Sequence, residues 1–95
     1  MTIFNGGLSN SIMKYMVIET FIKGNERAVY ERFHEKGRML PAGLHFIESW
    51  LEESGKRCFQ LMETDEQSLF DEWVLNWNDL VDFEIVPLGE KPQRG

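Results

Sequence analysis

The chain has 95 residues, of which 42% are hydrophobic and 13% aromatic, and its formal net charge at pH 7 is -6. This content excludes an intrinsically disordered chain and predicts one small globular domain. The acidic balance and the scattered Lys and Arg residues argue against nucleic-acid binding, which depends on clustered basic side chains. No apolar run approaches the roughly 20 residues that a membrane-spanning helix needs, so we expect no membrane partner.

The cysteine content and the amino-terminal residues predict a cytoplasmic protein. The only cysteine, Cys58, cannot form a disulfide within the chain and fits a reducing compartment. The segment MTIFNGGLSNSI lacks the charged start and the long apolar stretch of a signal peptide. We expect Cys58 to be a small buried hydrophobic residue rather than a nucleophile.

The first part of the chain predicts a strand followed by a helix. Residues 14–21 (KYMVIETF) alternate in side-chain type and are rich in strand formers. Asn25 follows a glycine and is suited to the N-cap of a helix. The apolar residues of that helix recur at helical spacing: Val29, Tyr30 and Phe33. We expect the helix to stop at Gly37, and Pro41 prevents it from continuing.

The second part of the chain predicts a hairpin, a second helix and a last strand. Residues 44–51 and 57–64 are predicted strands, and the turn between them, ESGK, contains a glycine. Thr64 and Gln67 match a capping box, which predicts the start of a helix. The apolar residues of that helix fall on one stripe: Leu69, Phe70, Trp73, Val74 and Trp77. Residues 80–88 predict the last strand.

The order strand, helix, strand, strand, helix, strand predicts an α+β fold of the ferredoxin-like βαββαβ type. In this fold a four-stranded antiparallel sheet carries both helices on one face. We expect the domain to span residues 13–88, after an N-terminal extension at 1–12 and before a polar C-terminal tail at 89–95. The other face of the sheet has no helix to cover it.

Side chains alternate along a strand, so each strand presents two sets of residues. One set is nearly free of polar groups and is expected to face the helices: Met16, Ile18, Phe59, Leu61, Val81, Phe83 and Ile85. The complementary set is expected on the uncovered face: Tyr15, Val17, Glu19, Phe21, Cys58, Gln60, Met62, Leu80, Asp82, Glu84 and Val86.

The length of the hairpin loop assigns the second strand to these faces. We predict a three-residue loop at 53–55 with the glycine in the left-handed conformation. The pairs across the hairpin would then be Trp50 with Cys58, Glu48 with Gln60 and Phe46 with Met62. A two-residue loop would instead send Ile47 and Leu51 to the uncovered face, because a one-residue slip exchanges the faces.

The predicted uncovered face combines large apolar groups with carboxylates. It is too apolar to remain in water and too acidic for a dry core. A second copy of the sheet, packed face to face around a partly polar cavity, satisfies both constraints. The sequence therefore predicts a homodimer of the dimeric α/β-barrel type, with the chain as its own partner.

Residues 13–88 resemble a family of short, uncharacterised bacterial proteins of the dimeric α/β-barrel superfamily of ferredoxin-like folds. The segments that carry the resemblance are MKYMVIETF, VYERFHEKGRMLPAGLHFIESWLEE, KRCFQLMET and LFDEW. The resemblance implies that Met13 is the usual first residue and that residues 1–12 are an extension. The family has no established activity, so it implies no catalytic residue. By fold analogy, the superfamily implies a cofactor-free oxygenase or isomerase as one alternative function.

Two classes of function follow from the predicted cavity. The first is a protein that binds a small, partly apolar ligand, with Glu48 or Glu19 as a general base of raised pKa. The residues expected to contact the ligand are Trp50, Phe46, Gln60, Glu84, Tyr15 and Arg38. The second is a noncatalytic dimer with a filled interior. A void of about 300 Å³ or more would favour the first class.

No motif predicts a metal or a cofactor. His34 and His45 stand apart from each other and from any Cys or Asp cluster at ligand spacing, and the chain has no Gly-rich phosphate loop. Desolvation and mutual repulsion should raise the pKa of at least one carboxyl among Glu19, Glu48 and Glu84, and Glu48 is our first choice.

Overall fold

The computed structural model describes residues 11–92 and has the predicted βαββαβ order. The elements are β1 (Met13–Phe21), α1 (Glu26–Lys36), β2 (His45–Leu51), β3 (Arg57–Thr64), α2 (Leu69–Leu75) and β4 (Val81–Leu88). The strands form one antiparallel sheet in the order β2-β3-β1-β4. The predicted ferredoxin-like α+β fold is confirmed.

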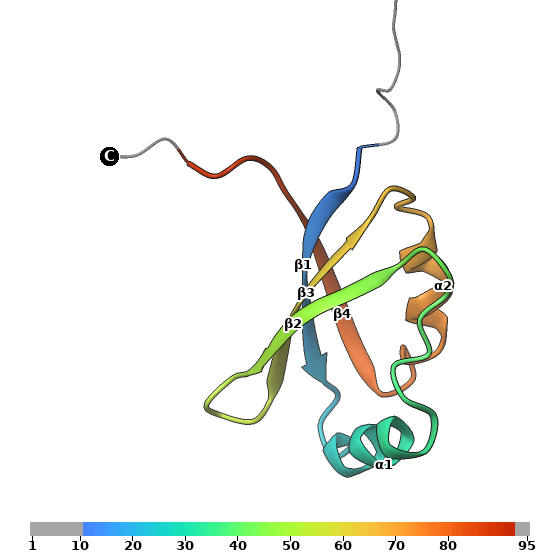
Figure 1. Cartoon of the computed structure of the whole chain (residues 1–95). Helices are drawn as coiled ribbons and strands as arrows, with labels where there is room; N and C mark the ends of the chain where they lie inside the picture. Colours follow the sequence, from blue (N-terminus) through green and yellow to red (C-terminus); the bar gives the residue numbers. More distant parts are fainter. Residues whose placement is uncertain (1–10, 93–95) are drawn as a thin grey trace, which may run out of the picture.

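Both helices pack on the same face of the sheet (Figure 1). From α2, the Phe70 ring lies 4.9 Å from the ring of Tyr15 on β1. From α1, the Tyr30 ring lies 6.1 Å from the ring of Phe21, also on β1. Tyr15 and Phe21 are separated by an even number of positions, so they share one face. We call this the covered face and the opposite one the open face.

The sequence-based assignment of β1 and β3 to the two faces is wrong. Val17 and Met62, predicted on the uncovered face, have no exposed surface and belong to the core of the covered face. The set predicted to meet the helices lies on the open face: Met16, Ile18, Phe59 and Leu61. The assignment of β4 is right: the side chains of Val81, Phe83 and Ile85 lie on the covered face. Ile85 pairs with Val17, which is on that face, and the other two follow at alternate positions.

The predicted three-residue hairpin loop is wrong as well. The backbone N–H of Glu52 donates to the carbonyl of Arg57, so residues 53–56 turn the chain. The register also shifts between Phe46 and Glu48, where β2 carries one extra residue. The observed pairs are Phe46 with Met62, as predicted, but Glu48 with Leu61 and Trp50 with Phe59. Glu48 and Trp50 nevertheless lie on the open face, as predicted. Their observed partners, Leu61 and Phe59, were predicted on the covered face but lie on the open one.

The loop between α1 and β2 is fixed at both of its ends. Helix α1 ends as predicted, since Gly37 adopts a φ of 69° and its N–H donates to the carbonyl of Phe33. At the other end, Thr64 Oγ1 donates to the carbonyl of Gly43 over 2.8 Å. Thr64 therefore fixes the end of a loop and does not cap a helix. Helix α2 begins only at Leu69, so the predicted capping box is wrong.

Candidate functional site

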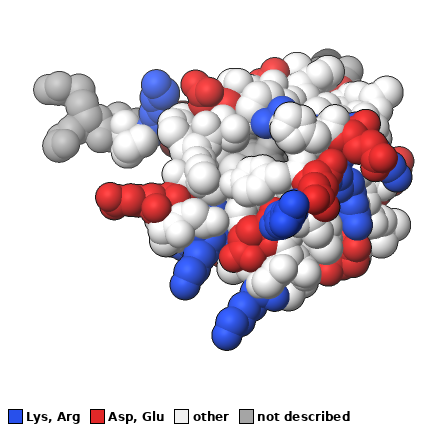
Figure 2. All heavy atoms as spheres, turned by 90° about the horizontal axis from the view of Figure 1, so that it is seen from below, with Lys and Arg blue, Asp and Glu red and all other residues white. Residues whose placement is uncertain are grey.

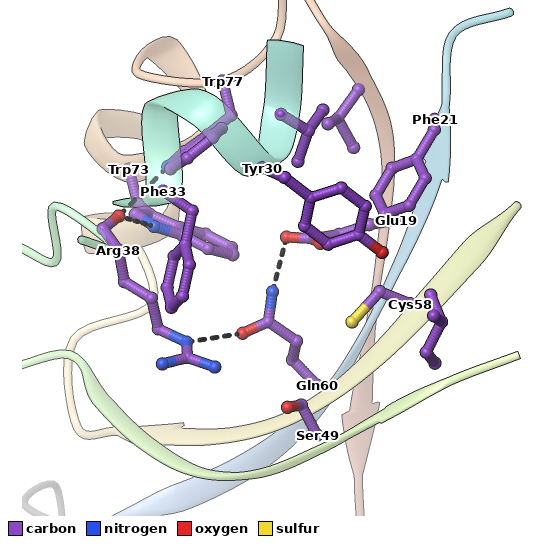
Figure 3. Close-up of a pocket in the computed structure, with 13 residues that line it drawn as sticks. Glu19, Phe21, Tyr30, Phe33, Arg38, Ser49, Cys58, Gln60, Trp73 and Trp77 are labelled. Carbon is purple, nitrogen blue, oxygen red and sulfur yellow. Dashed lines mark hydrogen bonds between the residues drawn. The ribbon is translucent and has the colours of Figure 1, made fainter. Parts of the chain in front are cut away.

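A cavity of about 270 Å³ lies between α1 and the covered face and is partly open to solvent. Figure 3 shows side chains from the helices, from the loop after α1 and from the sheet around this cavity. The cavity volume is just below the threshold of about 300 Å³ set above. An apolar cavity of about 150 Å³ can hold benzene, so this cavity still has room for one substituted ring. The residues that line it are Glu19, Phe21, Val29, Tyr30, Phe33, Arg38, Ser49, Leu51, Cys58, Gln60, Trp73, Trp77 and Val81.

Helix α2 holds the backbone that presents Arg38 to the cavity. The indole N–H groups of Trp73 and Trp77 both donate to the carbonyl of Arg38, over 2.9 and 3.0 Å. The side-chain amide of Asn76 donates to the carbonyl of Met39 over 3.1 Å. Met39 has a φ of 60°, a conformation that few residues other than glycine adopt. Three donors from α2 and the turn that follows it thus maintain an uncommon backbone geometry at this point.

The guanidinium of Arg38 is oriented by two aromatic rings and one hydrogen bond. Its central carbon lies 3.5 Å from the ring centroid of Phe46 and 5.2 Å from that of Phe33. Its Nε donates to Oε1 of Gln60 over 3.1 Å. Since a guanidinium has no acceptor, this contact requires the carbonyl oxygen of the Gln60 amide to face Arg38.

The other end of the Gln60 amide contacts a buried carboxyl group. Nε2 of Gln60 donates to Oε2 of Glu19 over 2.6 Å, and Glu19 is 7% exposed (Figure 3). One amide therefore connects Arg38 to Glu19, and its orientation suits both partners. Glu19 and Gln60 reach the same cavity because β1 and β3 are adjacent in the sheet.

Burial raises the pKa of Glu19 to about 7, while the hydrogen bond from Gln60 and the charge of Arg38 oppose the rise. Near neutral pH the carboxyl is therefore present in both protonation states. Such a group can accept or donate a proton at physiological pH, which is what a general acid or base requires.

Burial also raises the pKa of the Cys58 thiol to about 11; the nearby Glu19 adds to the rise and Arg38 opposes it. The thiolate is the nucleophilic form of cysteine, so this side chain is a poor nucleophile at neutral pH. Cys58 forms part of the cavity wall and is half-buried.

The structure brings together only some of the residues predicted at the site. Glu19, Gln60 and Arg38 line the cavity, and Phe46 contacts it through the Arg38 guanidinium. Tyr15 lies on the covered face but packs against Phe70 instead of lining the cavity.

The remaining predicted residues lie on the opposite side of the sheet. Glu48, Trp50 and Glu84 are exposed on the open face. Within the single chain, desolvation acts on Glu19, whereas our first choice, Glu48, is exposed. The expectation for Glu48 concerned a dimer and stays a prediction. The cavity formed by the chain lies between sheet and helix, whereas the sequence placed it between two sheets.

Sequence reasoning missed Tyr30, Phe33 and Ser49 as cavity-lining residues. Tyr30 and Phe33 were assigned to the apolar stripe of α1, yet they are 46% and 40% exposed. The signal in the sequence that could have identified them is a pair of aromatic residues one turn apart in a short helix whose other apolar residues, Ala28 and Val29, are small. Ser49 was missed because the cavity was expected between two sheets, on the face opposite to Ser49.

Charged groups elsewhere on the described surface are mixed in sign. Figure 2 shows acidic and basic side chains interspersed on the end of the molecule that carries α1. Within residues 11–92, no cluster of three or more His, Cys, Asp or Glu side chains could hold a metal ion. No helix in this range is long and apolar enough to cross a membrane.

The fold and the site define a small ferredoxin-like α+β protein with a buried acid and an arginine at one cavity. The family model of a domain of unknown function, DUF3303, matches residues 13–91, and the chain belongs to that family. Comparisons with curated proteins and with solved structures gave no match.

Proposed function

We propose that this protein binds a small, partly apolar molecule in the cavity between α1 and the sheet, and that Glu19 exchanges a proton with it. The observation that carries this proposal is a buried carboxyl at the wall of an open cavity, connected through Gln60 to Arg38. A carboxyl buried for packing alone would be costly, because desolvation disfavours its charged form. Functional sites are where such costs are commonly retained.

The pKa of Glu19 supports proton transfer. A general acid or base works best when its pKa is near the ambient pH, and that of Glu19 is about 7. Proton abstraction next to a carbonyl group is the reaction type that such a site suits best. This chemistry is compatible with the cofactor-free isomerase or oxygenase alternative that the fold analogy suggested.

A screen of single-ring compounds by NMR on isotope-labelled protein tests the binding proposal. We expect shifts of amide signals in α1 and β3, and we expect Ser49→Phe, which fills the cavity, to abolish them. Ser54→Phe, on the exposed hairpin turn, is the matched control and should leave binding unchanged. Absence of any bound compound, together with a Glu19 that titrates like a solvated carboxyl, would favour the noncatalytic alternative.

We also propose that the protein is a homodimer through the open face, as in the dimeric α/β-barrel superfamily that its sequence resembles. Support comes from the apolar residues of β1 and β3 that the helices leave uncovered: Met16, Ile18, Phe59 and Leu61. Trp50 lies beside Phe59 and is 50% exposed. Contiguous apolar surface of this kind is uncommon on monomers. A bacterial, cytoplasmic origin stays a prediction.

Light scattering at micromolar concentration tests the dimer. We expect the mass of two chains for the wild type and of one chain for Phe59→Glu, which would bury a carboxylate in the interface. A wild-type protein that stays monomeric would contradict this proposal and leave the cavity proposal intact, since the cavity is formed within one chain.

A further inference from the structure

We propose that the cavity selects small carboxylic acids with one flat, apolar ring, and that the carboxylate of the ligand binds the terminal nitrogens of Arg38. This inference rests on the proposed function and adds the chemical class of the ligand. It derives from the donors that the site leaves unused and from the shape and charge of the cavity.

The terminal nitrogens of Arg38 are the unused donors. Its Nε donates to Gln60, and its backbone carbonyl accepts two indole N–H groups. Within residues 11–92, neither Nη1 nor Nη2 of Arg38 has a hydrogen-bond partner. The two nitrogens form a planar fork that matches the two oxygens of a carboxylate. Since the guanidinium is already stacked on Phe46, little side-chain freedom remains to be lost when a ligand binds.

The charge of the cavity suits a single negative charge. Arg38 is the one Lys or Arg residue among those that line the cavity. A phosphate group carries a charge of about -1.5 to -2 and three strong acceptor oxygens, which one guanidinium does not satisfy. A carboxylate carries one charge and two acceptor oxygens. The cavity therefore matches a monocarboxylate better than a phosphate ester.

The walls of the cavity suit a flat apolar body. The lining includes five aromatic side chains: Phe21, Tyr30, Phe33, Trp73 and Trp77. Aromatic rings pack well against one another in offset or edge-to-face geometry. A volume of about 270 Å³ accommodates one ring with its substituents.

Glu19 supplies the second polar contact. Gln60 occupies Oε2, whereas Oε1 has no hydrogen-bond partner among the described residues, although Glu19 is only 7% exposed. A buried polar atom without a partner is costly, so a ligand group that reaches it gains binding energy. A hydroxyl group on the ring of the acid would satisfy this oxygen while the carboxylate contacts Arg38.

Calorimetric titration of the full chain with benzoate, 3-hydroxybenzoate and benzamide tests the inference. Benzamide has nearly the shape of benzoate but no charge. We expect benzoate to bind the wild type about 10- to 100-fold more tightly than benzamide, the range for a charge-assisted bidentate contact. The hydroxyl group of 3-hydroxybenzoate should improve affinity further, and Glu19→Ala should remove that gain.

Variants of Arg38 separate charge from geometry. Arg38→Gln should abolish the preference for benzoate over benzamide, and Arg38→Lys should restore only part of it, because an ammonium group lacks the planar fork. Arg27→Gln, at an exposed position of α1, is the matched control and should bind as the wild type does. Thermal unfolding of each variant establishes that it is folded before titration.

The pH dependence provides a second readout. The other titratable groups that line the cavity are Arg38, Cys58 and Tyr30. Ionised Glu19 repels the ligand carboxylate, so benzoate affinity should fall as pH rises through about 7 in the wild type and remain flat in Glu19→Gln. Equal affinity for benzoate and benzamide would overturn the inference while leaving a neutral-ligand site possible. Binding of none of the three probes also overturns it, and the proposed function fails with it only if the wider single-ring screen is negative.

Discussion

The two faces of the sheet place the same residue type in opposite surroundings. On the covered face, Glu19 lies under α1, shares a hydrogen bond with Gln60 and has its pKa raised to about 7 by burial. On the open face, Glu48 and Glu84 are exposed to water. The strands that carry these residues belong to one sheet. On the covered face, the helix packed over Glu19 desolvates its carboxyl group and so raises its pKa.

The apolar residues of the two faces differ in the same way. Val17 and Met62 are fully buried against the helices, whereas their neighbours Ile18 and Leu61 remain partly exposed. The free energy gained by burial is therefore complete on one face within a single chain. On the open face it is incomplete within a single chain, and the proposed second copy would complete it.

The largest expected difference between the faces is in core packing. Met62→Ala should lower the free energy of unfolding by about 2 to 5 kcal/mol, because it leaves a void in a fully buried site. Leu61→Ala, the adjacent position on the open face, should lower it less, and its effect should depend on protein concentration. Chemical denaturation at two protein concentrations measures both. Equal, concentration-independent losses would contradict the assignment of the faces.

The next difference is in pH dependence. Glu19 has a folded pKa of about 7 against 4.5 in the unfolded chain, so its contribution to stability is complete below pH 4.5 and is lost as pH rises through 7. The loss is about 3 kcal/mol at 1.36 kcal/mol per pKa unit. Glu19→Gln should remove this decline and be more stable than the wild type at about pH 8.

Denaturation of wild type and variant between about pH 4 and pH 8 measures this effect, since the range spans both pKa values. Gln67→Ala, at an exposed and uncharged position before α2, is the control, and its profile should parallel that of the wild type. A Glu19→Gln profile with the wild-type slope would mean that the carboxyl is solvated in the folded protein.

The third difference concerns dimerisation. Trp50→Ala should weaken the dimer by about 2 kcal/mol, or about 30-fold, because large aromatic residues at the centre of an interface dominate its energy. Arg27→Ala, on the exposed side of α1, should leave the dissociation constant unchanged. Analytical ultracentrifugation over a dilution series gives both constants. A variant Trp50→Ala with wild-type affinity would place this side chain outside the interface.

The smallest effect is expected from an ion pair on the open face. Nζ of Lys14 on β1 lies 3.5 Å from Oε1 of Glu63 on β3, and the two side chains are 55% and 29% exposed. Lys14→Ala should cost at most about 1 kcal/mol, and salt should reduce the cost, because exposed pairs are weakened by solvent. Urea denaturation at low and high ionic strength measures it. A larger, salt-independent cost would mean that a second copy of the chain buries this pair.

The order of the elements could be predicted because it depends on local patterns. The alternation in β4, the stop at Gly37 and the stripe of α2 that buries Phe70 and Trp73 each involve residues within a few positions of one another. The capping box failed because Thr64 found a partner in the distant Gly43, which no local pattern indicates.

The faces of β1 and β3 could not be predicted because both of their residue sets are largely apolar. Counting polar residues assigned the set with Glu19 and Gln60 to the outside. In the fold, these two residues share a hydrogen bond inside, next to Arg38. The error therefore fell at the candidate site, where buried polar groups break the general pattern.

The sequence by itself determined the fold class, the presence of one sheet face without a helix, and the expectation that some carboxyl group would have a raised pKa. Only the tertiary structure decided that this group is Glu19. Desolvation depends on which face α1 covers, and that is set by the pairing of β1 with β3 and β4 across many residues of intervening chain. A shift of one residue in these long-range pairings would exchange the faces and move the carboxyl from the cavity into water.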